Sequence, residues 1–346
     1  MRYDQQLDNL CFVFETLVEI RFEGLKAERR TFALHSRRGT LSVNGHSGMF
    51  SADTSKFGRR SWLAGAAAAV VGVCGPGSLR ASPNFETRSL ETAGKHAKRF
   101  ELLIPAKPTK LLIALHGLGE SFEEEAGARA WLDRYGLSSS YDRLLAPPLS
   151  RTHKRKDWTD DRLVSVNRSL AEKSWAGLAV VCPFTPNFRY VSYRTKALDE
   201  YADWLVDKVL PKALAELGEV APKLGDRAKL AINGCSMGGP LALEVATRHP
   251  KIFGSLGVVQ AAFGEHRAKS YAGLLSKAFA DAGTMDLQLL ASEGDTFVTS
   301  ARALARELKA NDLNHQLLVL PGPHDQQWLR EAGTIEMLMF HERGQV

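Results

Sequence analysis

A serine set between two glycines is the feature of this chain whose residue types are best suited to chemistry. Gly234, Ser236 and Gly238 follow the pattern Gly-x-Ser-x-Gly. A serine at the tip of a tight strand-to-helix turn has a strained backbone, and residues two positions away have room only for a hydrogen atom. The mostly apolar run 229–232, and the helical spacing of apolar residues up to Pro250, predict this strand–turn–helix context. We therefore predict a nucleophilic Ser236; a glycine-rich turn with an incidental serine is the structural alternative.

The second requirement is a base, because a serine hydroxyl alone is a weak nucleophile, and the base in turn needs an orienting carboxylate. In sites of this kind both partners follow the serine along the chain. His324 is the best candidate, because the apolar run 316–320 and a Pro-Gly-Pro loop place it just past the carboxyl end of a strand. His266 and His341 lie in polar helical or terminal sequence, which favours a surface position for both.

The orienting acid is expected at the end of another strand. Residues 287–291 have the pattern of a buried strand, and Asp295 lies in the loop that follows, with Glu293 as the reserve acid. Helical spacing resumes at Val298, so capping of that helix is the structural alternative for Asp295. Asp325 adjoins the histidine in sequence, but neighbouring side chains diverge, so we do not expect it to orient the ring.

Backbone N–H groups that stabilise an oxyanion are the remaining requirement of acyl transfer. The predicted strand 110–115 ends in a loop that contains Gly117 and Gly119, where missing side chains let the backbone approach a substrate. One amide is expected from Met237, the residue after the nucleophile, and the other from Leu118 in this loop.

Two features near this loop are given structural roles. His116 is interpreted as a hydrogen-bonding residue of the loop rather than a second base. Ser121, with Glu124 three positions later, has the pattern of a capping box that begins the next helix.

These motifs resemble those of secreted α/β-hydrolases of the esterase type, a group that includes esterase D-like, feruloyl esterase-like and polyhydroxybutyrate depolymerase-like proteins. The resemblance covers roughly residues 98–340. It implies an α/β-hydrolase fold in a single domain, and a serine esterase that acts on a small-molecule or polymeric ester through an acyl-enzyme on Ser236. A peptidase or acyltransferase with the same triad, or a non-catalytic binding protein on the same scaffold, remains open. The matching segments are Leu115–Gly119, Gly234–Gly239, Arg248–Pro250, Phe253, Gly294–Asp295 and Pro323–His324.

The spacing of apolar residues predicts alternating strands and helices, which is typical of a mostly parallel central sheet with helices on both faces. Strands are expected near 98–104, 110–116, 177–183, 228–233, 253–260, 286–291 and 315–320. Helices are expected near 121–135, 195–217, 237–249, 267–281, 298–310 and 325–340.

Residues 136–176 form a long connection that follows no pattern we can assign. Long connections inside compact domains usually carry lids or binding loops. One interpretation is a lid or cap insertion over the serine, with Tyr141, Trp158 and Trp175 as an apolar wall for the acyl or alcohol group. The other is a solvated loop, since a basic run such as 151–156 is typical of an exposed segment.

The front of the chain predicts export. The pair Arg59-Arg60 precedes an apolar run, 64–73, that is shorter than the roughly 20 residues needed to span a bilayer. This pattern resembles a twin-arginine signal peptide, which we place at 49–81. It predicts a periplasmic or extracellular bacterial protein with no stable membrane span after cleavage; an N-terminal membrane anchor is the alternative.

The signal also sets the expected domain boundaries. Starting at Met49 gives the signal a short polar leader, so residues 1–48 are interpreted as an upstream extension absent from the natural protein. An amphipathic helix over 7–22 is the alternative for that stretch. Residues 82–346 then form the catalytic domain, which is long enough for one α/β domain with a sizeable core.

Charge and motif content argue against several classes of function. Of the net charge of +6, most belongs to residues 1–81, which carry eleven Lys and Arg against seven Asp and Glu. No basic–aromatic pattern supports nucleic-acid binding. Walker phosphate loops and His-Glu-x-x-His are absent, so neither a cofactor nor a metal is expected. Cys182 and Cys235 lie on predicted strands with another strand between them, so we expect no disulfide. The sequence does not predict the oligomeric state.

Overall fold

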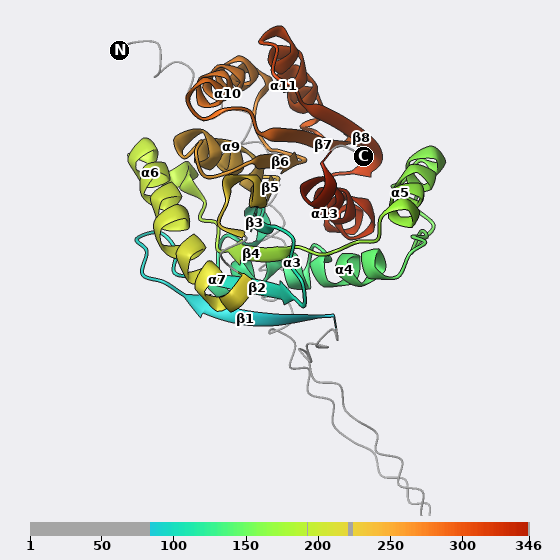
Figure 1. Cartoon of the computed structure of the whole chain (residues 1–346). Helices are drawn as coiled ribbons and strands as arrows, with labels where there is room; N and C mark the ends of the chain where they lie inside the picture. The colour runs from blue at the N-terminus through green and yellow to red at the C-terminus, as the bar shows by residue number, and fades with distance from the viewer. Residues whose placement is uncertain (1–83, 192, 221–223, 345–346) are drawn as a thin grey trace, which may run out of the picture. The chain divides into compact units, whose positions relative to one another are not determined.

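The computed structural model describes residues 84–191, 193–220 and 224–344, which contain one eight-stranded sheet (Figure 1). The predicted extension over 1–48 and the predicted export signal over 49–81 lie outside the described residues. The strand order is β1-β2-β4-β3-β5-β6-β7-β8. β2 pairs antiparallel with both of its neighbours, β1 and β4. All pairs from β4 onward in this order, through β3, β5, β6 and β7 to β8, are parallel. The strands are β1 (Phe85–Glu91), β2 (Arg99–Pro105), β3 (Leu111–Leu115), β4 (Ala179–Pro183), β5 (Leu230–Cys235), β6 (Ser255–Val259), β7 (Asp286–Gly294) and β8 (Gln316–Pro323).

The central strands are continuous apolar runs because helices cover both faces of the sheet. β3 reads Leu-Leu-Ile-Ala-Leu and β4 reads Ala-Val-Val-Cys-Pro, and every residue of both strands is buried. β1 differs, because exposed polar residues interrupt its partly buried ones, as suits a strand at a sheet edge. No apolar run marks β1, so the sequence prediction began the sheet at β2 and missed this strand.

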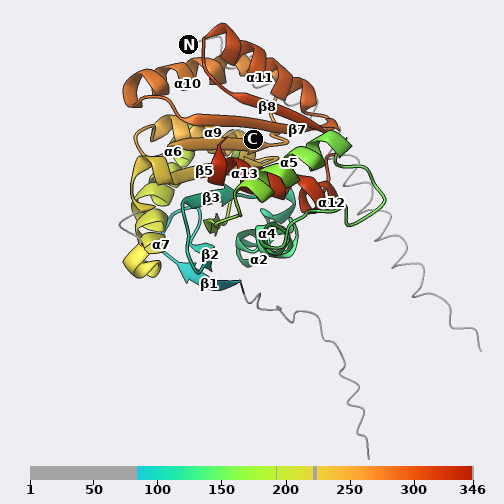
Figure 2. The same ribbon diagram turned by 45° about the vertical axis from the view of Figure 1, so that its right-hand side comes forward.

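Helices lie on both faces of the sheet, as predicted. Figures 1 and 2 both show α6, α9 and α10 on one face and α4, α5 and α13 on the other. None of the described helices is both long and apolar enough to cross a bilayer. The helices are α2 (Glu124–Ala128), α3 (Ala130–Asp133), α4 (Leu137–Leu145), α5 (Asp160–Glu172), α6 (Arg194–Trp204), α7 (Leu210–Glu216), α9 (Gly238–Arg248), α10 (Ala268–Ala282), α11 (Val298–Ala310), α12 (Gln326–Trp328) and α13 (Thr334–Arg343).

Helix boundaries depart from the prediction where the helical pitch changes. α11 has the predicted bounds. The helix expected over 195–217 is instead α6 and α7 joined by a π-helical turn, Leu205–Val209. The helix expected over 325–340 is α12 and α13 joined by a second such turn, Leu329–Gly333. Apolar spacing cannot show these turns, because a π-turn adds a single residue to an otherwise helical pattern.

The capping box predicted at Ser121 and Glu124 is wrong. The Ser121 hydroxyl donates to the carbonyl of Leu118 at 2.8 Å and so closes a short 3₁₀ turn. The carboxylate of Glu123 accepts from two free N–H groups in the first turn of α2 and caps that helix. The helix expected over 121–135 therefore begins later and is split into α2 and α3.

The segment 136–176 contains two helices that the sequence did not predict, α4 and α5. α5 buries only Val166 and Leu170, so its apolar pattern is too sparse to predict a helix. Figure 2 shows α5 beside α13, and the guanidinium of Arg162 on α5 donates to Glu336 on α13 at 2.6 and 2.7 Å. The segment is therefore packed against the C-terminal helix.

The three aromatic residues predicted to wall a substrate pocket lie in the core. Exposed fractions are 1% for Tyr141, 1% for Trp158 and 5% for Trp175. The Tyr141 hydroxyl donates to the carbonyl of Leu178 at 3.1 Å, and the Trp158 indole donates to the carbonyl of Glu331 at 3.0 Å. These side chains have too little free surface to contact a substrate, so the predicted wall is incorrect.

The surface position predicted for His341 is also wrong. His341 is fully buried on α13, with Nε2 2.9 Å from Asn233 Nδ2 and Nδ1 2.8 Å from Ser255 Oγ. Burial lowers the pKa of His341 to about 3, with the charge of Lys110 as a smaller cause. The imidazole is therefore a neutral hydrogen-bonding link between the helix and the sheet.

Acid is expected to destabilise the protein through its buried histidines. Burial also lowers the pKa of His116 to about 4. Below the ordinary histidine pKa of about 6.5 the unfolded chain binds two protons that the folded chain does not, so stability present above pH 6.5 is lost on acidification. Each histidine should contribute about 1.4 kcal/mol per pH unit, from about pH 6.5 down to its folded pKa. Urea unfolding at several pH values measures this slope.

The check on this prediction is His341→Gln, which removes the titrating imidazole and should therefore have a shallower pH dependence than the wild type. Equal slopes for the wild type and His341→Gln would contradict the assignment of a neutral buried imidazole.

Candidate active site

Three polar side chains follow three strands of the sheet directly. Ser236 comes after β5, Asp295 after β7 and His324 after β8. These strands belong to the parallel part of the sheet, so their carboxyl ends lie at one edge. In open α/β sheets this edge is where ligands bind.

The structure joins these three residues by hydrogen bonds. His324 Nε2 lies 3.1 Å from Ser236 Oγ, and His324 Nδ1 lies 2.8 Å from Asp295 Oδ1. The Asp295 side chain is fully buried, whereas 29% of the His324 side chain is exposed. A ring whose Nδ1–H donates to the carboxylate presents a bare Nε2 to the serine hydroxyl, which is the tautomer a general base needs.

The alternative acids are placed elsewhere. Glu293 is exposed and pairs with Arg302 at 2.8 Å, and Asp325 pairs with Arg155 at 2.7 Å. Asp295 Oδ1 also accepts the N–H of Phe297 at 2.9 Å, but Phe297 itself is the N-cap residue of α11. Asp295 therefore lies two positions before the N-cap residue, and its side chain does not cap α11.

Ser236 lies on a turn with the expected steric restrictions. Its φ is 50°, in the left-handed region that side chains rarely occupy. A Cβ on Gly234 would lie 2.0 Å from the carbonyl oxygen of Gly238, and a Cβ on Gly238 would lie 2.6 Å from that of Leu115. Both glycines are therefore required by backbone contacts, as the sequence pattern predicted.

The two amides predicted to stabilise an oxyanion begin helical segments near the serine. Leu118 opens a 3₁₀ turn, Leu118–Glu120, and Met237 is the N-cap residue of α9. N–H groups at such positions have no acceptor within their own helix. Gly117 lies directly against the nucleophile, because a Cβ there would be 3.3 Å from Ser236 Cβ. At Gly119 a Cβ would meet nothing within 4 Å, so packing does not explain that glycine.

His116 has the structural role predicted for it. It is fully buried, its Nδ1–H donates to the carbonyl of Gly117 at 2.8 Å, and its Nε2 accepts the N–H of Thr185 at 2.8 Å. Since burial lowers its pKa to about 4, the ring is neutral at pH 7. It fixes the loop after β3 to the loop after β4.

A buried carboxylate near this loop was not anticipated from the sequence. The Gly117 N–H donates to the hydroxyl of Tyr135 at 3.2 Å, and that hydroxyl donates to Glu120. Gln326 Nε2 donates to the same carboxylate at 3.0 Å. Burial raises the pKa of Tyr135, which keeps its hydroxyl a donor. Glu120 therefore links the loop beside Ser236 with the segment that follows His324.

Gln260 is a second residue that the sequence did not reveal. It follows β6 with φ 48° and is buried. Its side-chain amide donates to Ser292 Oγ at 2.6 Å and to the carbonyl of Pro323 at 3.0 Å. Gln260 thus supports the residue immediately before His324.

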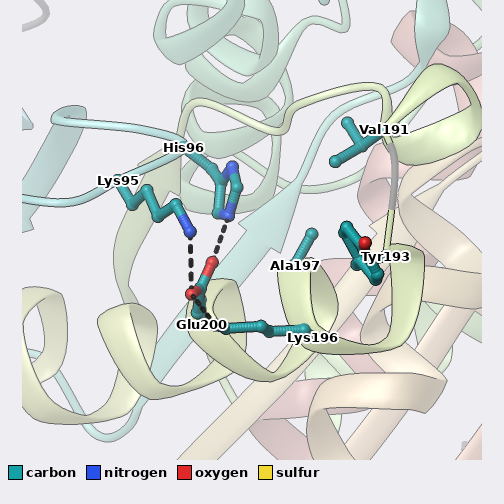
Figure 3. A pocket seen from close by; sticks show the side chains of 7 residues that line it. All are labelled: Lys95, His96, Val191, Tyr193, Lys196, Ala197 and Glu200. Carbon is teal, nitrogen blue, oxygen red and sulfur yellow. Dashed lines mark hydrogen bonds and ion pairs between the residues drawn. The ribbon is translucent and has the colours of Figure 1, made fainter.

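A surface hollow of about 280 Å³ is separate from these residues (Figure 3). At its centre Glu200 contacts Lys95 Nζ at 2.9 Å and His96 Nε2 at 2.8 Å. No member of the triad lines it, so we do not assign the chemistry to this hollow. The lining residues are Lys95, His96, Val191, Tyr193, Lys196, Ala197 and Glu200.

Metal ligands and a disulfide are the remaining chemical features of the described chain. Among residues 84–344, as far as they are described, no group of three or more His, Cys, Asp or Glu side chains is arranged to hold a metal ion. Cys182 and Cys235 are both free and buried, and β3 lies between their strands.

Comparison with solved structures shows the fold. No protein-family model matches the sequence, and no curated protein matches it either. A ferulic acid esterase superposes with a TM-score of 0.53 at 15% identity, over 76% of this chain and 99% of that one. The feruloyl esterase module of Clostridium thermocellum has a TM-score of 0.49 at 13% identity, over 72% and 85% of the two chains. S-formylglutathione hydrolase FrmB of Staphylococcus aureus has a TM-score of 0.47 at 16% identity, over 74% and 98%. The superposition on the ferulic acid esterase, together with the strand order of the sheet, shows the predicted α/β-hydrolase fold.

Proposed function

We propose that this α/β-hydrolase-fold protein is a serine hydrolase that cleaves carboxylic esters through an acyl-enzyme on Ser236. The observation that carries the proposal is the continuous hydrogen-bond chain from Ser236 through His324 to Asp295. It provides the serine with a base and provides the base with a buried carboxylate that fixes its tautomer.

The first half of the reaction forms the acyl-enzyme. As Ser236 Oγ attacks the ester carbonyl carbon, its proton passes to Nε2 of His324, and Asp295 stabilises the resulting imidazolium. The carbonyl oxygen becomes an oxyanion, to which the N–H groups of Leu118 and Met237 donate. His324 then returns the proton to the departing alcohol oxygen, and the ester bond breaks.

The second half releases the acid. Water attacks the acyl carbon while His324 Nε2 takes one of its protons, and the oxyanion forms again at the same two amides. Collapse of this intermediate breaks the bond to Ser236 Oγ, which regains its proton from His324. The products are a carboxylic acid and an alcohol, and the protein is unchanged.

The strained serine favours an enzyme over a binding protein on the same scaffold. A non-glycine residue in the left-handed region costs about 1–3 kcal/mol, and such strain persists mainly where it serves a function. A binding protein has no need of a serine hydroxyl held 3.1 Å from a histidine nitrogen. Peptidases and acyltransferases use the same machinery, so only their substrates separate them from an esterase.

Apolar surface near the site supports an apolar acyl or alcohol group. Leu118 is 45% exposed and Phe122 is 84% exposed, next to the loop that contacts Ser236. The ring of Phe297 packs edge-on to that of His324, with 5.8 Å between the ring centroids. Phe297 is thus placed to contact a bound substrate.

Turnover of an ester panel tests the proposed function. Purified protein is assayed on p-nitrophenyl esters from acetate to palmitate, on succinate hemiesters and on matching p-nitroanilides. We expect saturable ester hydrolysis, apolar acyl groups favoured over charged ones, and amide cleavage slower by orders of magnitude. Faster cleavage of the anilides would indicate a peptidase, and no turnover of any compound would favour the binding-protein alternative.

A further inference from the structure

Arg155 connects the segment before α5 to the loop that carries His324. Its Nε donates to both oxygens of Asp157, at 2.8 and 2.9 Å. Its two terminal nitrogens donate to both oxygens of Asp325, at 2.7 and 2.9 Å. Such two-pronged pairing between a planar guanidinium and carboxylates fixes orientation as well as distance. Figure 2 shows this segment beside α12.

The two carboxylates that Arg155 holds meet the chain on either side of His324, one at Gly322 and the other at position 325. Asp325 is the next residue, and its Oδ1 also accepts the N–H of Trp328 and so caps α12. Asp157 is fully buried and lies against Gly322, where a Cβ would be 2.6 Å from Asp157 Oδ1. Gly322 has φ 114°, a conformation that favours glycine. The backbone is thus held on both sides of the histidine.

The two carboxylates that Arg155 contacts differ in their exposure to solvent. The side chain of Asp157 is not exposed, whereas the side chains of Arg155 and Asp325 are 30% and 39% exposed. Removing the guanidinium would leave the buried carboxylate of Asp157 without an ion-pair partner from Lys or Arg among the described residues, and with the imidazole of His153 at 3.5 Å. A buried charge that loses its partner is costly, so the loop is expected to rearrange.

We propose that Arg155 is a positioning residue that holds His324 in line with Ser236, and that the segment 150–158 therefore sets the rate of turnover rather than the choice of acyl chain. The proposal rests on the proposed serine hydrolase function. It gives one member of the basic run 151–156, Arg155, a role in the active site, in place of the lid or the solvated loop considered from the sequence. Displacement of a catalytic group by about 1 Å can cost about a hundredfold in rate, although no substrate contact is lost.

The test compares Arg155→Ala, Arg155→Lys, Asp325→Asn and, as the matched control, Lys154→Ala, which removes an exposed cation one position away. For Arg155→Ala we expect kcat to fall about 10- to 100-fold with KM changed less than about twofold. The rate of labelling by a fluorophosphonate should fall by a similar factor. Arg155→Lys should recover only part of the rate, because one ammonium cannot bridge both carboxylates. Asp325→Asn should behave like Arg155→Ala, and Lys154→Ala like the wild type.

Chemical rescue separates positioning from loss of stability. Because Arg155 lies at a partly exposed site, millimolar guanidinium should restore part of the kcat of Arg155→Ala and none of that of Arg155→Lys. Circular dichroism checks that each variant is folded. If Arg155→Ala does not fold, Asp325→Asn still tests the proposal, because it removes the other partner of the same ion pair.

An active, labelled wild type whose folded Arg155→Ala and Asp325→Asn variants retain kcat would overturn this inference and leave the proposed function intact. A rise in KM alone, or an altered acyl-chain preference, would also overturn it, since Arg155 would then contact substrate. A wild type with neither turnover nor labelling would overturn the proposed function and this inference together.

Discussion

Replacing Ser236 by alanine is expected to lower kcat for ester hydrolysis by about five to six powers of ten. The acyl-enzyme cannot form without Oγ, and only oxyanion stabilisation and substrate binding remain, which together accelerate the reaction about 10³- to 10⁴-fold over water. KM should change little, because the hydroxyl contributes to the transition state rather than to ground-state binding. Steady-state assay of the most reactive ester measures both constants.

Cys235, one position away, provides the matched control. Burial raises the pKa of its thiol well above the ordinary range, so the thiol stays protonated and is a poor nucleophile. Cys235→Ala should keep kcat within a few-fold of the wild type. A Ser236→Ala protein that retains more than about a thousandth of the wild-type rate would contradict the serine mechanism.

Replacing Asp295 by asparagine is expected to lower kcat by about four powers of ten. The carboxylate oxygen that accepts from His324 Nδ1 is buried, so no water can take its place. An amide there favours the opposite tautomer, which places a proton on Nε2 and leaves the ring unable to accept from Ser236. The pH dependence of kcat/KM, measured beside the wild type, reports this loss of a functional base.

Glu293 is the control for that assignment. It is exposed and paired with Arg302, so Glu293→Gln should keep the wild-type kcat. If Glu293→Gln lost more activity than Asp295→Asn, the roles assigned to these two acids would have to be exchanged.

The parts of the fold that the sequence predicted are those in which local pattern and tertiary environment agree. The buried parallel strands are continuous apolar runs, and α11 has a regular apolar stripe with the predicted bounds. β1 was missed because its residues are mostly exposed, and α5 because it buries so little. His341 was placed wrongly because a polar, C-terminal sequence hides the fact that α13 is buried along its whole described length except at its last residue.

The three triad candidates could be predicted because each one directly follows a strand and their order along the chain is restricted. The supporting residues could not. Arg155 and Asp325 are 170 positions apart, and Glu120 and Gln326 are 206 apart. No local pattern links such pairs, so only the folded chain reveals them. The export signal placed at 49–81 stays a prediction, because it lies outside the described residues.

The most direct test of the central claim is the site of covalent labelling by a fluorophosphonate, located by mass spectrometry of a proteolytic digest. The phosphorus should be attacked by an activated serine alone, because the reagent mimics the ester carbonyl and needs both the base and the oxyanion amides. We predict one adduct per chain, on Ser236, absent in Ser236→Ala and formed far more slowly in His324→Ala. An unlabelled wild type, or an adduct on another residue that persists in Ser236→Ala, would contradict the account.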